Sequence, residues 1–299
     1  MDTQFPETTN FTVSYILDYA IYPIRPRPEV ADFKQESGIM NTNVNQERII
    51  NVPIILGRHK LQFDCFTGDF QTRVLSHGQI WERHIVEFIL ANVTPNRPFF
   101  DIGANIGFHS VICQKYSKEK PTVVSVEPHP TIIQVLKKNR SQNNCDFHIV
   151  EAACWDSSGY VEMNLELGSD TGDTFVTAGD VKVSTVLIDD LADRFGHPRI
   201  IKMDIQGFEA DAILGAAKTI ERGNIDVIVE FDPKISERSS KNLMESFMLF
   251  EKNNYTPFFF RAHPGYAAEL ISYDILRSFH TLWLQKKVSG MDLVFRRRK

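Results

Sequence analysis

One short stretch combines a carboxylate, two glycines and an asparagine: Asp101, Gly103, Asn105 and Gly107. Glycine lacks a Cβ, so Gly103 and Gly107 suit a tight turn or a close approach of the backbone to a ligand. We expect Asn105 to cap a helix that begins at about residue 106. The free N–H groups and the positive dipole end of that helix would face the space above the preceding strand. This combination predicts a nucleotide-type binding site.

The spacing of the glycines separates two kinds of nucleotide site. The dinucleotide fingerprint is G-x-G-x-x-G, with three glycines around a pyrophosphate. This chain has G-x-x-x-G instead, with Asp101 just before the first glycine. A carboxylate there repels pyrophosphate and suits a cationic group, such as the amino or sulfonium group of S-adenosylmethionine (SAM). The motif therefore favours SAM, and a strand, turn and helix with only a structural role is the alternative.

Three further acids end predicted strands, namely Glu127, Asp204 and Glu230. Ligands of open α/β sheets bind outside the carboxyl ends of the strands, so we expect these acids and Asp101 to gather around one crevice. Capping of the following helices is the alternative. Glu127 is expected to accept both ribose hydroxyls of an adenosine, because a carboxylate offers two acceptor oxygens. The small side chain of Ala152, after the next strand, leaves room for the adenine ring.

Methyl transfer to a hydroxyl is an in-line displacement that gains from a positioned base. Asp204 is the first candidate for this base, although it could instead hold the amino group of the cofactor or cap the next helix. His109, in the first helical turn, and Glu230 are further candidates, with packing or solvent exposure as the alternative for His109. Glu82 is expected beside the cofactor and acceptor, or in a surface ion pair. Lys202 shares a face with Asp204, but no second lysine completes a lysine–acid catalytic set.

The elements that position these residues are predicted from apolar periodicity. Residues 1–46 form an irregular arm, residues 47–80 a β-hairpin extension with a short helix, and residues 81–299 the main domain. Strands and helices alternate in the main domain, which is typical of a mostly parallel, doubly wound α/β sheet. Its predicted strands are 99–101, 122–126, 147–152, 160–165, 181–188, 199–203, 225–229, 256–260 and 291–295, and its predicted helices are 81–91, one from about 106, 130–143, 209–220 and 239–252.

The composition excludes several classes of protein. The 299 residues are 42% hydrophobic and carry a formal net charge of -5, so no nucleic-acid partner is expected. The four cysteines lack metal-ligand spacing, which predicts reduced thiols, a cytoplasmic location and no metal site. No stretch approaches the roughly 20 apolar residues of a membrane span, and the N-terminus does not read as a signal peptide.

Several motifs, in their order and spacing, resemble the FkbM family of class I SAM-dependent methyltransferases. Coverage runs from about residue 48 to the C-terminus. Gln206 departs from the pattern, because the family usually has an acid there, and this bears on the choice of acceptor. The matching pieces are W-E at 81–82, F-D-I-G-A-N-I-G at 100–107, V-E-P-H-P at 126–130, I-D-D-L at 188–191, I-K-M-D-I-Q-G-F-E at 201–209, L-G-A at 214–216 and V-E at 229–230.

The resemblance implies a Rossmann-like, seven-stranded sheet with one antiparallel strand at its edge, SAM as cofactor, and methyl transfer to oxygen. The implied acceptor is a hydroxyl of a sugar, a glycan or another small natural product. A non-catalytic SAM-binding module and, less favoured, a nucleotide-cofactor oxidoreductase are the alternatives. The expected cofactor-binding residues are Glu82, Asp101, Gly103, Ala104, Asn105, Gly107, Glu127 and Ala152.

Overall fold

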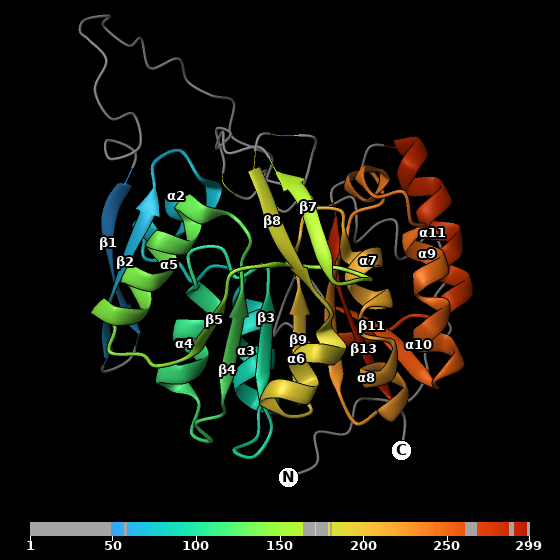
Figure 1. The fold of residues 1–299 in the computed structure, drawn as a ribbon, viewed down its shortest axis with the longest axis horizontal. Helices are drawn as coiled ribbons and strands as arrows, with labels where there is room; N and C mark the ends of the chain where they lie inside the picture. Colours follow the sequence, from blue (N-terminus) through green and yellow to red (C-terminus); the bar gives the residue numbers. More distant parts are fainter. Residues whose placement is uncertain are drawn as a thin grey trace, which may run out of the picture.

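The computed structural model describes residues 49–56, 59–163, 171, 179, 181–260, 268–286 and 290–297. The arm predicted for residues 1–46 lies outside these residues, and so does most of the segment 164–180. The described residues form a large mixed sheet between helices, a hairpin at one side and a small second sheet (Figure 1). The predicted α/β fold is confirmed.

The main sheet has, within the described residues, eight strands in the order β12-β11-β13-β10-β9-β3-β4-β5. The five strands from β10 to β5 are parallel to one another. Their carboxyl ends therefore lie along one edge of the sheet, the upper edge in Figure 1. The bounds are β3 (Phe99–Ile102), β4 (Val123–Val126), β5 (His148–Val150), β9 (Ile200–Met203), β10 (Asp226–Phe231), β11 (Tyr255–Phe260), β12 (Ala268–Leu270) and β13 (Met291–Arg297).

Strand β13 corrects the expectation of a single antiparallel strand that lies at the edge. It lies inside the sheet and pairs antiparallel with β10 on one side and with β11 on the other. Leu293, Val294 and Phe295 are fully buried, and a strand that is apolar on both faces belongs in the interior of a sheet. The edge is formed by the short strand β12, which was not expected and adds one strand to the predicted seven.

Helices cover both faces of the sheet. Phe99 and Ile200 point to the face that carries the hairpin, α3, α4 and α5. Phe100 and Ile201 point to the opposite face, which carries α6 to α11. This confirms the doubly wound arrangement. The bounds are α3 (Arg83–Asn92), α4 (Phe108–Tyr116), α5 (Pro130–Gln142), α6 (Ile188–Phe195), α7 (Glu209–Leu214), α8 (Ala217–Arg222), α9 (Leu243–Ser246), α10 (Met248–Lys252) and α11 (Tyr273–Lys286).

Some boundaries differ from the prediction. Helices α6 and α11 were not expected, and Ile188 begins α6 instead of ending a strand. The predicted helix 209–220 is divided into α7 and α8 at Gly215, where a Cβ would overlap the carbonyl oxygen of Trp155. The predicted strands β7 (Gly159–Met163) and β8 (Val181–Val186) form a separate sheet with β6 (Ala153–Cys154). No described helix is both long and apolar enough to cross a membrane.

The expected hairpin consists of β1 (Ile49–Leu56) and β2 (His59–Phe66) and is followed by α2 (Phe70–Ser76). Asn139 of α5, which is fully buried, connects this hairpin to the glycine stretch. Its amide donates to the carbonyl oxygens of Asp64 at 3.0 Å and Ile106 at 2.9 Å, and its Oδ1 accepts the N–H of Asp64 at 2.7 Å. The hairpin thus helps to fix the backbone that enters α4.

We expect Asn139→Ala to lower the free energy of unfolding by about 2–4 kcal/mol, because it leaves buried backbone groups of Asp64 and Ile106 without partners. Urea denaturation measures this change. Gln134→Ala, at an exposed position of the same helix, serves as the control and should cost less than about 1 kcal/mol. Equal costs for the two variants would contradict the role of Asn139.

Candidate active site

The glycine stretch forms a bend between β3 and α4. Gly103 has a φ of +78°, and its N–H and that of Ala104 both donate to the carbonyl oxygen of Val126, at 2.9 and 3.0 Å. A Cβ on Gly103 would overlap the carbonyl oxygen of Asp204 at the end of β9. The bend therefore packs directly between the ends of β4 and β9, and only glycine fits at its first position.

Asn105 does not cap α4, contrary to the prediction. The residue before the helix is Gly107, which has a φ of +83°, and α4 begins at Phe108. The helix starts two residues late because Gly107 adopts the left-handed conformation that separates the bend from the helix. Asn105 itself has a φ of +48°, and its side-chain amide lies 3.4 Å from Thr171 Oγ1.

Asp101 is buried beneath this bend, with 1% of its surface exposed. Its Oδ2 accepts the hydroxyl of Ser110 at 2.6 Å, while its Oδ1 has no hydrogen-bond partner among the described residues. Burial raises the pKa of Asp101, and the nearby Lys202 ammonium opposes that rise. One carboxyl oxygen is thus available at the point where a cationic group was expected.

Glu127 follows β4 and supports the bend from the other side. Its Oε2 accepts the N–H of Asn105 at 3.0 Å, and its Oε1 accepts the N–H of His129 at 2.9 Å. Burial raises the pKa of Glu127 to about 7. A carboxylate has about four acceptor positions, so each oxygen keeps one for a further donor. Ala152 is buried just after β5, the strand next to β4.

A row of polar side chains crosses the sheet at this edge. Asp101 is in register with Ser125 of β4 and with Lys202 of β9, so the three lie on the face covered by α3 and α4. Two residues further along the strands, Glu230 of β10 is in register with Asp292 of β13. The sheet therefore presents ionisable groups from four adjacent strands.

We call Glu82, Asp204, Glu230 and Asp292 the acidic cluster. Lys202 lies among them and is 4% exposed. Its Nζ is 3.1 Å from Asp204 Oδ2 and 4.0 Å from Glu82 Oε2. Burial acts to lower the pKa of Lys202, but the surrounding carboxylates outweigh burial and raise it. This lysine is therefore charged and compensates part of the cluster.

Gln206 connects two members of the acidic cluster. Its side-chain amide lies 3.2 Å from Asp204 Oδ1 and 3.4 Å from Glu230 Oε2, and its backbone has a φ of +57°. The turn that contains it is held by Glu209, whose carboxylate accepts the N–H groups of Ile205 at 2.9 Å and Gly207 at 3.0 Å. This role of Glu209 was not expected from the sequence.

His109 and Glu82 meet at the cluster from two different helices. His109 Nε2 lies 3.3 Å from Glu82 Oε2, but neither atom makes a hydrogen bond with a described residue. Burial lowers the pKa of His109 well below its usual value, and Lys202 acts in the same direction, so the ring is neutral near pH 7. Glu82 precedes α3 with a φ of +41°, an uncommon conformation for a residue with a side chain.

The acids of the cluster differ in their affinity for protons. Burial acts to raise the pKa of Asp204, but the charge of Lys202 and the hydrogen bonds from Glu230, Lys202 and Gln206 together outweigh it, and the pKa is lowered. Burial raises the pKa of Glu230 well above its usual value, and repulsion from Asp204 adds to the rise. A base works best when its pKa lies near the working pH. On this ground the ionised form of Glu230 is a stronger base than Asp204.

We expect Glu127 and Glu209 to make the protein less stable as the pH rises. Burial raises the pKa of each to about 7 from the usual 4.5, so the unfolded chain ionises first. Between pH 4.5 and 7, each group should remove up to about 3 kcal/mol of stability. Urea denaturation across this range tests the slope, which Glu127→Gln and Glu209→Gln should each reduce. An unchanged slope in both variants would contradict these assignments.

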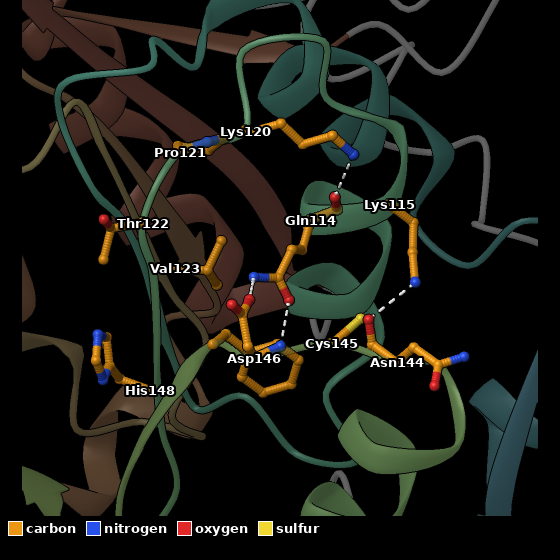
Figure 2. A pocket seen from close by; sticks show the side chains of 11 residues that line it. Gln114, Lys115, Lys120, Pro121, Thr122, Val123, Asn144, Cys145, Asp146 and His148 are labelled. Atoms are coloured by element: carbon orange, nitrogen blue, oxygen red, sulfur yellow. Dashed lines mark hydrogen bonds between the residues drawn. The ribbon is translucent and has the colours of Figure 1, made fainter.

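A pocket of about 620 Å³ lies away from this site. It is formed where β4 and β5 begin, at the opposite edge of the sheet, and none of the predicted site residues lines it (Figure 2). Lys115 and Lys120 donate to the carbonyl oxygens of Asn144 and Gln114 at its rim, at 3.0 and 3.1 Å. It lacks the glycine bend and the row of acids.

The structure thus brings most predicted site residues together and adds some that were missed. Lys202 was discounted, although the alternation of β9 places it on the same face as Asp101 and gives a signal for its position. His84, on α3, was not noticed, and its Nε2 lies 2.7 Å from Asp292 Oδ2. Contact between these two could not be inferred, because 208 positions separate them in the chain.

Comparisons with known proteins agree with the resemblance. Residues 101–257 match the methyltransferase FkbM domain. The hexuronic acid methyltransferase AglP of Haloferax volcanii is 26% identical over 175 residues, which cover 54% of this chain and 71% of AglP.

The chain is also similar, at low sequence identity, to solved structures of methyltransferases. A methyltransferase FkbM from Methylobacillus flagellatus is 19% identical with a TM-score of 0.43, over 68% of this chain and 44% of its own. Precorrin-6y C5,15-methyltransferase from Geobacter metallireducens is 9% identical with a TM-score of 0.40, over 73% of this chain and 90% of its own. The match to the FkbM domain covers slightly more than half of this chain, and the chain therefore belongs to the FkbM family of methyltransferases.

Proposed function

We propose that the chain transfers a methyl group from SAM to a hydroxyl of a sugar, a glycan or a related small molecule. The observation that carries this proposal is the glycine bend, with Asp101 and Glu127 beside it and the acidic cluster next to it. The hexuronic acid methyltransferase AglP supports a sugar acceptor, since it matches this chain across most of its own length.

The residues around the bend fit the cofactor. Oδ1 of Asp101, which has no hydrogen-bond partner among the described residues, can accept a hydrogen bond from an ammonium group, and the backbone at Gly103 and Ala104 allows close approach. Glu127 retains acceptor positions for two ribose hydroxyls, and Ala152 leaves space near the end of β5. When bound, SAM supplies a methyl group already activated by its sulfonium.

The protein's own contribution is to hold the acceptor oxygen and to remove its proton. Asp204 is placed at the end of β9, beside the bend, where it can orient a hydroxyl group. Glu230, with its raised pKa, is the preferred proton acceptor, and Gln206 holds it close to Asp204. His109 is neutral and can accept a proton or position Glu82. Positioning and general base catalysis together are the expected sources of rate acceleration.

Calorimetry and a transfer assay test the proposal together. The intact protein should bind SAM and S-adenosylhomocysteine with saturation and should transfer labelled methyl to hydroxyls of a sugar panel. Binding without transfer to any hydroxyl would favour a non-catalytic SAM-binding module. Thermal protection by NAD(H) but not by SAM would favour an oxidoreductase.

We expect Glu230→Gln to lower kcat by about 10²-fold or more, because the variant cannot take up the hydroxyl proton. Binding of S-adenosylhomocysteine should change less than about threefold, since the carboxyl is not expected to contact the cofactor. Asp274→Asn, a surface acid with 89% of its side chain exposed, is the matched control. A larger loss in Asp204→Asn, with an unchanged pH profile in Glu230→Gln, would assign the base to Asp204 instead.

A further inference from the structure

We propose that the acceptor is electrically neutral or cationic next to its reacting hydroxyl, and that hexuronates and phosphorylated sugars are excluded. This inference rests on the proposed function and names the class of substrate for the same site. It separates the chain from AglP, which is named as a hexuronic acid methyltransferase.

The charges around the proposed acceptor position carry the argument. Four carboxyl groups form the acidic cluster, and Lys202 is the cation among them. Its Nζ is already shared between Asp204 and Glu82 at 3.1 and 4.0 Å. An anionic acceptor would add a further negative group beside these carboxyls, and its burial without a counter-charge is costly.

Two other basic side chains near the cluster, in the described part of the chain, are also engaged. His84 Nε2 is 2.7 Å from Asp292 Oδ2, on the far side of the cluster. Arg238 donates from Nη1 to the carbonyl oxygen of Gln206 at 3.1 Å. Acidic ligands are usually bound by a bidentate guanidinium or by a lysine ammonium. Neither of these two contacts offers such a group to an incoming carboxylate.

Unpartnered atoms in the same place show that a polar ligand group belongs there. His109 is 6% exposed and its Nε2 points at Glu82 Oε2, yet both atoms are buried without a hydrogen bond to any described residue. Buried polar atoms are normally satisfied. A hydroxyl or an amine of the acceptor can donate a hydrogen bond to one of these two atoms. A hydroxyl can also accept a hydrogen bond from the other. A carboxylate or phosphate has no proton to donate.

The negative potential of the site also affects the pKa of one of its own carboxyl groups, Glu230. Burial and repulsion from Asp204, Glu209 and Asp292 raise the pKa of Glu230 well above its usual value. A site that already disfavours the ionisation of its own carboxyl disfavours an added anion for the same reason.

The test compares matched sugars with the intact protein and SAM. For each of several hexoses, three compounds are offered: the methyl pyranoside, the methyl glycoside of the corresponding uronic acid with its carboxylate free, and the 2-amino sugar. The value of kcat/KM is measured from labelled methyl transfer. We expect at least tenfold preference for a neutral or amino sugar over its uronate. A uronate used equally well or better, with cofactor binding intact, overturns the inference and leaves the proposed function standing. Transfer to no member of the panel contradicts both.

Variants show whether charge is the cause of the preference. Asp292→Asn removes one carboxylate and releases His84, so it should reduce the preference for the neutral sugar at least threefold. Asp274→Asn removes a carboxylate from the surface of α11 and should leave the preference unchanged. An unchanged preference in Asp292→Asn, or an equal change in both variants, would contradict the electrostatic origin.

Discussion

Replacing Gly103 by alanine is expected to abolish cofactor binding and to lower the free energy of unfolding by about 2–5 kcal/mol. The φ of +78° is unfavourable for any residue with a side chain, and the new Cβ would overlap the carbonyl oxygen of Asp204. Either the bend moves away from β9 or the end of β9 moves, and both changes displace the backbone that should approach SAM. Calorimetry with S-adenosylhomocysteine and urea denaturation measure the two effects.

Gly78→Ala provides a closely matched control for this variant. Gly78 has a φ of +69°, but a Cβ there would meet no atom within 4 Å. Only the conformational cost of about 1–2 kcal/mol remains, and cofactor binding should be unchanged. If both alanine variants bind S-adenosylhomocysteine as the parent protein does, the glycine bend is not part of the cofactor site.

Lys202→Met is expected to have the second large effect, a loss of about 3–5 kcal/mol of stability together with a loss of methyl transfer. Methionine keeps much of the apolar volume, but Asp204, Glu82 and Asp101 lose an ammonium group that compensates them. Removing one partner of a buried ion pair leaves an uncompensated charge. The pKa of Asp204 should then rise, because the charge of Lys202 is the largest of the influences that lower it.

Urea denaturation and the pH profile of kcat measure these changes. Lys241→Met is the control, since Lys241 forms its ion pair with Asp156 at the surface and should leave stability and activity nearly unchanged. A Lys202→Met protein that is as stable as the parent, with the same pH profile, would contradict the proposed electrostatics of the acidic cluster.

The central strand, the glycine bend and the acids at the strand ends could be predicted from local sequence. Short apolar runs that end in an acid indicate both the direction of a parallel strand and the edge where ligands bind. Asp101, Glu127, Asp204 and Glu230 therefore gave the position of the site before any packing was known. The structure places all four at the predicted edge, although their contacts with a ligand stay a prediction.

The remaining features depend on contacts between distant parts of the chain. The interior position of β13 follows from pairing with β10 and β11, which no local pattern specifies. The start of α4 was misplaced because Asn105 is a good capping residue, whereas the left-handed Gly107 sets the boundary. The alternation of β9 indicates the face on which Lys202 lies, but not its contact with Glu82, which precedes α3 and is 120 positions earlier in the chain.

A crystal structure of the protein with S-adenosylhomocysteine is the most direct test of the proposed site. We expect the ligand to lie over Asp101 and Gly103, with its ribose hydroxyls on Glu127 and its sulfur facing Asp204 and Glu230. A ligand bound elsewhere, for example in the pocket of Figure 2, or one whose ribose lies far from Glu127, would contradict the assignment.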